Sequence, residues 1–189
     1  MKKSTKITLI VIIAIAIIAI ISTIVMMQRK NGKANLETLN VSTTEEMKDL
    51  VEKIYKGVEV FPTLETAEVD LNDKDMVENI TGLKKVEDID SIVVSEPMMS
   101  SQAYSMVLAK VKENTDIEKI AKEMNESVNP NKWICVSAEK VYTTSSGNIV
   151  FLVMSAEDIA KPVFENFKKI ANDTGKEYER TYEETIPEL

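Results

Sequence analysis

The sequence predicts an α+β fold: an N-terminal transmembrane helix, then one domain with an antiparallel sheet of four to five strands and helices mainly on one face. Three observations lead to this prediction. Residues 7–27 are uncharged and almost entirely apolar. Farther along the chain, helical patterns alternate with short apolar runs. Two of those runs, 133–142 and 149–155, flank a polar turn and indicate a hairpin. A chain of 189 residues has room for one such domain.

The run ITLIVIIAIAIIAIISTIVMM, residues 7–27, contains nothing more polar than serine and threonine. As a helix it would be about 31 Å long, which matches the hydrocarbon core of a bilayer. A helix of a soluble core would show a polar stripe, and a signal peptide would have a shorter apolar region before a small-residue cleavage site. The run has neither feature. We therefore expect an uncleaved anchor with the lipid bilayer as its partner.

The orientation of this anchor depends on charge. The basic residues before the run (Lys2, Lys3, Lys6) and after it (Arg29, Lys30, Lys33) are nearly balanced and hardly select an orientation. The rest of the chain carries 17 basic against 31 acidic residues, a formal charge of −14. An anionic cytoplasmic leaflet would repel such a domain. We therefore expect residues 1–6 in the cytoplasm and the domain on the extracytoplasmic side of the cell membrane.

The first elements after the span are predicted from caps and periodicity. Residues 28–42 have no sustained period and are expected to form a tether, followed by the domain at 43–172. Two overlapping capping boxes in STTEE begin a helix with one apolar face, which ends at Gly57. AEVDL is expected to be a short strand. NDKDMVENITG is expected to be a short helix that Gly82 closes.

The second half is richer in strands. SIVVS and AYSMVLAKV are predicted strands, and the latter is apolar on both sides, as in an interior strand covered on both faces. DIEKIAKEMNESV is a predicted helix. WICVSAEKVY and IVFLVMS should pair through the turn TTSSGN. The last helix begins near Ser155, and Pro162 predicts a kink or a restart. The acidic tail, 173–189, is expected to be loosely held.

Candidate binding residues lie mostly in SEPMMSSQAYSMVLAKVK, where one predicted strand ends and the next begins. They are Glu96, Met98, Met99, Tyr104 and, before the hairpin, Trp133. Two exposed methionines would form an adaptable contact surface. The alternatives are that Met98 and Met99 fill the edge of the core and that Trp133 is a packing anchor.

The composition excludes several chemistries. The chain has no histidine and one cysteine, Cys135, so it has no histidine-based triad, no histidine-rich zinc site and no intramolecular disulfide. Without histidine as a base, Cys135 is expected to pack in or beside the core as a small hydrophobe. Ser100 and Ser101 lack the lysine of an S-x-x-K motif. We therefore predict no catalytic residue.

Metal and nucleic-acid sites are not predicted either. DLNDKD begins like a calcium loop, but the required glycine and the later glutamate are missing. Nucleic-acid binding requires clustered basic residues, whereas the domain is acidic. The sequence therefore predicts no metal, no cofactor and no nucleic-acid partner.

Three stretches, VSEPMMSSQAYSMVLAKVK, NPNKWICVSAEKV and GNIVFLVMS, resemble a bacterial family known only as domain of unknown function 4358. The resemblance covers roughly residues 39–171, and its most specific residues are Glu96, Pro97 and Trp133. Members of that family are small secreted or membrane-anchored proteins, often lipoproteins, so the resemblance implies an extracytoplasmic domain. This chain lacks the cysteine that lipoprotein members process. The family has no assigned activity.

Two functions stay open at this point. The first is a non-catalytic module that binds another envelope protein or a small ligand through its strand-end loops. The second is a hydrolase or transferase that acts on envelope polymers through carboxylates. A pocket with two acids, one with a raised pKa, would favour the enzyme, and a shallow methionine-lined patch would favour the module. No sequence feature indicates catalysis, so we expect the module.

Overall fold

The computed structural model describes residues 39–61, 63–99 and 101–183. In this part of the chain, six strands form one antiparallel sheet in the order β1-β2-β3-β5-β4-β6. The strands are β1 (Leu64–Glu68), β2 (Ile89–Pro97), β3 (Ser105–Val111), β4 (Lys140–Ser146), β5 (Ile149–Ser155) and β6 (Tyr178–Thr181). The helices are α2 (Thr44–Tyr55), α3 (Lys74–Thr81), α4 (Ile117–Ser127) and α5 (Glu157–Ala171). The α+β class with an antiparallel sheet is confirmed, but the sheet has six strands rather than four to five.

The predicted anchor at residues 7–27 lies outside the described residues, together with residues 1–6 and most of the predicted tether. Among the residues that the structure does describe, no helix is both long enough and apolar enough to cross a membrane.

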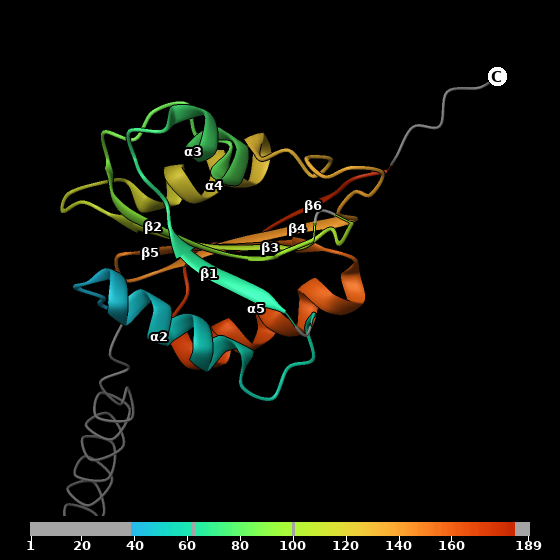
Figure 1. Cartoon of the computed structure of the whole chain (residues 1–189). Coiled ribbons are helices and arrows are strands. Elements are labelled where there is room, and N and C mark those ends of the chain that lie inside the picture. The colour runs from blue at the N-terminus through green and yellow to red at the C-terminus, as the bar shows by residue number, and fades with distance from the viewer. Residues whose placement is uncertain (1–38, 62, 100, 184–189) are drawn as a thin grey trace, which may run out of the picture. The chain divides into compact units, whose positions relative to one another are not determined.

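Helices cover both faces of the sheet: in Figure 1, α3 and α4 lie above it and α2 and α5 below it. The prediction that helices lie mainly on one face is therefore wrong. The reason lies in the central strands, because β3 directs Val107 and Ala109 toward one core and Met106 and Leu108 toward the other. All seven residues of β5 are buried. Strands that are apolar on both sides need a helical layer on each side.

The predicted hairpin forms, but with different limits. Residues 133–135 bend away instead of beginning the strand, and β4 begins only at Lys140. β4 then continues through residues 143–146, which the polar sequence TTSS had suggested as a turn, and the chain reverses between Ser146 and Ile149. The hydroxyls of this segment are satisfied inside the domain. Ser146 Oγ, for example, donates to the carbonyl of Asp173 at 2.7 Å.

The C-terminal residues belong to the sheet as well. β6 pairs with β4, so the prediction of a loose tail from residue 173 is wrong for residues 178–181. Buried Asn125 of α4 supports this pairing, because its Nδ2 donates to the carbonyl of Val141 in β4 and to that of Tyr178 in β6.

Pro162 lies inside α5, which is one helix from Glu157 on rather than a helix that restarts there. The predicted first strand is also shifted, because β1 ends at Glu68.

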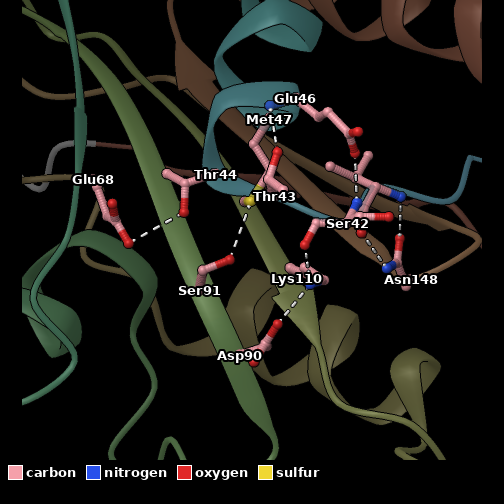
Figure 2. A network of polar contacts seen from close by, with 11 residues as sticks. Ser42, Thr43, Thr44, Glu46, Met47, Glu68, Asp90, Ser91, Lys110 and Asn148 are labelled. Carbon is pink, nitrogen blue, oxygen red and sulfur yellow. Dashed lines mark hydrogen bonds and ion pairs between the residues drawn. The ribbon is translucent and has the colours of Figure 1, made fainter.

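The chain enters the domain beside the turn between β4 and β5 (Figure 2). Asn148 binds the entering backbone twice, because it accepts from Val41 N–H at 3.0 Å and donates to the Val41 carbonyl at 2.7 Å. Lys110 Nζ donates to the carbonyl of Ser42 at 2.8 Å and forms an ion pair with Asp90 at 2.6 Å. Residues 39–42 are therefore part of the domain and not of a tether.

Gly147 is expected to be essential to this entry point. Its φ is +57°, and a Cβ at that position would collide with the carbonyl of Leu39. Gly57 provides the control, because its φ is +79° but nothing lies within 4 Å of an added Cβ. Gly57→Ala should cost about 1–2 kcal/mol of unfolding free energy from backbone strain alone, and Gly147→Ala clearly more. Urea unfolding of both variants measures this, and equal losses would show that Leu39 does not pack there.

Candidate functional site

Four of the five predicted binding residues are at least partly exposed at one end of the sheet. Glu96 lies one residue before the end of β2 there, the connection to β3 carries Met98 and Met99, and the segment after α4 brings Trp133. This end is opposite to the end where Lys110 contacts the entering chain. We define the sheet-end site as Glu96, Met98, Met99, Lys132, Trp133 and Ile134.

A buried ion pair connects the two segments of the site. Lys132 Nζ lies 2.5 Å from Glu96 Oε1, and the two side chains are 3% and 30% exposed. The same ammonium donates to Ser105 Oγ at 3.3 Å and lies 5.2 Å from the centre of the Trp133 ring. Burial lowers the pKa of Lys132, while the charge of Glu96 and its hydrogen bond oppose this shift. Glu96 therefore serves as the counterion that lets a lysine lie inside the protein.

Local structure explains why these groups meet. Ser95 pairs with Met106 across the two strands, so Glu96 and Ser105 are the next neighbours along the ladder. Strand alternation puts Glu96 on the face that α3 and α4 cover. The chain returns to this face after α4 through a turn in which Asn129 Oδ1 accepts from the Asn131 N–H. This turn leads directly to Lys132.

The site also exposes apolar side chains. Met98, Met99 and Ile134 are 70%, 61% and 71% exposed. The two methionines therefore do not fill the edge of the core. Trp133 is partly buried and packs against the core beneath α3 and α4, so it is an anchor at the border of the site. Because Lys132 is bound to Glu96, Ile134 is held to the strand that leads into Met98 and Met99.

Tyr104 directly precedes β3 at the same end of the sheet, but it is buried on the other face, contrary to its prediction as a binding residue. It is 0% exposed and belongs to the core on the α2 and α5 face. Its hydroxyl donates to the hydroxyl of Tyr55 at 3.0 Å, and Phe61 packs edge-on against its ring. Burial raises the pKa of Tyr104, and burial raises the pKa of Tyr55 to about 12.

Cys135 is exposed, so the prediction that it packs in or beside the core is wrong. It lies in the bend after Trp133 with a φ of +61°, and this bend turns its side chain outward where a strand would have continued. The described residues contain no group of three or more acidic or cysteine side chains arranged to hold a metal ion.

Sequence reasoning missed Lys132 and Ile134. A single lysine after a turn is normally solvated, and its partner is 36 residues away in the sequence, so no local pattern marks it. Ile134 was hidden in an apolar run typical of a strand.

No family model, curated protein or solved structure matches this chain. The functional inference therefore rests on the residues of the site.

The two halves of the ion pair should differ in importance. Glu96→Gln leaves an almost fully buried ammonium without a counterion and should cost about 2–4 kcal/mol of unfolding free energy. Lys132→Met leaves a carboxylate that water reaches and should cost about 1–2 kcal/mol. The control is Lys122→Met, which removes a pair on the surface of α4 with both partners more than half exposed. It should cost less than about 0.5 kcal/mol. Denaturant unfolding that gives similar values for all three variants would contradict this description.

The buried pair Tyr55 and Tyr104 should make the stability of the domain depend on pH in the alkaline range. The pKa of Tyr55 is about 10 in the unfolded chain and about 12 in the folded domain. The folded domain therefore favours the neutral phenol, and the contribution of Tyr55 to the free energy of unfolding is complete below pH 10 and is lost as the pH rises toward 12. Tyr55→Phe removes this contribution, which is on the order of 2 kcal/mol. Urea midpoints between pH 8 and 11.5 should therefore fall more steeply for the natural protein than for the variant. Parallel curves would show that Tyr55 is not buried.

Proposed function

We propose that this chain is a membrane-anchored extracytoplasmic protein of the bacterial cell envelope, and that its domain is a non-catalytic module that binds another envelope protein. The observation that carries the binding role is the exposure of Met98, Met99 and Ile134 on two segments held together by a buried ion pair. We infer from this link that the three side chains contribute to one apolar surface, and such exposed surfaces are typical of protein-binding sites.

The chemistry of the site favours a protein with an apolar surface as the partner. Methionine side chains are flexible and polarizable, so Met98 and Met99 can adapt to a partner. Trp133, partly exposed beside Ile134, adds a residue type that is enriched at the centres of interfaces. The Lys132–Glu96 pair keeps these side chains in place before binding, which reduces the entropy that association costs.

Anchoring and external location are supported by the sequence. The run at residues 7–27 has the length and composition of a membrane span, and the remaining chain is strongly acidic. The resemblance to domain of unknown function 4358 implies the same location, and we propose membership in that family on the motifs around Glu96 and Trp133.

Catalysis by carboxylates receives no support from this site. Glu96 is the one acid among the candidate binding residues, and its carboxylate is already engaged by the ammonium of Lys132, whereas acid–base catalysis by carboxylates uses two of them. The site is therefore better suited to binding than to acid–base chemistry.

The experiment uses a membrane-impermeant amine crosslinker added to intact cells that produce the full-length chain. The natural protein should form a specific crosslinked product. A variant with Met98→Ser, Met99→Ser and Ile134→Ser should lose at least about tenfold of it, because three apolar contacts disappear. Met76→Ser is the control, since Met76 is 49% exposed but lies in α3. It should leave the product unchanged.

Three outcomes would contradict the proposal. If the domain's lysines are modified only after the cells are broken, the domain does not face outward. If the domain is modified but yields no crosslinked product, the binding role is wrong. If the triple variant and the Met76→Ser control give equal amounts of product, the sheet-end site is not the binding surface. Unchanged thermal unfolding of the triple variant shows that any loss is not caused by misfolding.

A further inference from the structure

Two glutamates meet beside the sheet-end site. Glu65 of β1 is the direct cross-strand partner of Glu96 of β2, so both side chains lie on the same face of the sheet. Lys132 Nζ forms its ion pair with Glu96, whereas exposed Glu65 forms none with any described residue. Like charges directly opposite each other destabilise a sheet. The free domain therefore leaves one carboxylate here without a cation.

Other charges at this end of the sheet have the same sign. Glu139 lies directly before β4 and is exposed. Its carboxylate accepts a hydrogen bond from the Glu157 N–H at 3.2 Å but forms no ion pair within the described ranges. The lysines that follow are engaged, because Lys140 pairs with a glutamate of β6 at 2.7 Å and Lys161 with Glu157 at 3.5 Å. A cation that approaches this end would therefore be attracted.

The exposed apolar side chains belong to the same two segments as the ion pair. Met98 follows Glu96 by two residues, and Ile134 follows Lys132 by two. Glu65 is exposed on an edge strand, unlike a catalytic acid, which is placed in apolar surroundings. This arrangement is typical of a binding surface, in which apolar side chains are covered by the partner and charges at the rim select it.

On the basis of the proposed function, we propose that the partner of the sheet-end site is a protein segment that carries apolar side chains flanked by lysine or arginine. The apolar side chains cover Met98, Met99 and Ile134. One basic side chain forms with Glu65 the ion pair that the free domain lacks. A second copy of this chain and an anionic lipid surface are poorer occupants, because both are negatively charged.

The test is a fluorescence titration of the full-length chain in an uncharged detergent with synthetic peptides. Trp133 is the only tryptophan of the chain and belongs to the sheet-end site, so its emission reports binding there. The probe is the end-blocked peptide KKLLKK, and the controls are QQLLQQ and EELLEE, which keep the apolar residues. KKLLKK should change the emission saturably and bind at least about tenfold more tightly than either control, because only its charge is complementary. Raising the salt from about 50 to about 500 mM should weaken it severalfold.

Glu65→Gln locates the charge contact. It should weaken KKLLKK binding about threefold, because one exposed ion pair is lost. It should not lower the thermal unfolding temperature, because it also removes the repulsion between Glu65 and Glu96. Glu113→Gln is the matched control, since Glu113 is exposed but follows β3 at the opposite end of the sheet. This control should leave the affinity unchanged.

The inference is overturned if KKLLKK does not saturate, if QQLLQQ binds as tightly, or if Glu65→Gln and Glu113→Gln have equal effects. Each of these results would leave the apolar surface of the proposed function in place. If the variant with Met98→Ser, Met99→Ser and Ile134→Ser binds KKLLKK normally, the proposed function is contradicted as well. A lower unfolding temperature of Glu65→Gln would show that this carboxylate already has a partner, and would remove the basis for a cationic one.

Discussion

The constraint that organises this domain is the burial of its two central strands on both faces. Met106, Val107 and Leu108 are consecutive residues of β3 and are all 0% exposed, so neither face can meet water. β5 has the same character over its whole length. An antiparallel sheet of this kind is stable only between two helical layers, which is why α2 and α5 cover one face and α3 and α4 the other.

Because helices cover both faces of the sheet, polar and charged side chains form their hydrogen bonds and ion pairs at its ends and edges. At one end, Asn148 and Lys110 hold the entering chain. At the other end, Lys132 and Glu96 join the segment after α4 to β2. A buried ion pair adds little net stability, because desolvating both charges offsets most of their attraction. Its consequence here is positional, since it determines where Ile134 is presented relative to the turn that carries Met98.

The sequence predicted the parts of the fold that depend on local pattern. The capping residues before α2 and the two-sided apolar strand β3 were recognisable because their signals lie within about ten residues. The missed parts depend on distant contacts. Residues 143–146 look like a turn until Asp173 and its neighbours pair with their hydroxyls.

The candidate site was predictable only in part, for the same reason. Met98 and Met99 were visible because a proline and polar residues around them mark a turn. Tyr104 was predicted to be a binding residue, although it directly precedes the largely buried strand β3 and bonds to Tyr55, 49 residues away. Lys132 could not be found at all, because only the folded chain brings it to Glu96.

The most direct test of this account is amide hydrogen exchange of residues 131–136 in the natural protein and in Lys132→Met. If the ion pair holds this segment on the sheet, these amides exchange faster throughout the segment in the variant, while the amides of β3 and β5 keep their protection. Unchanged exchange at residues 131–136 would show that the segment is held by other contacts, and that the ion pair does not position the binding surface.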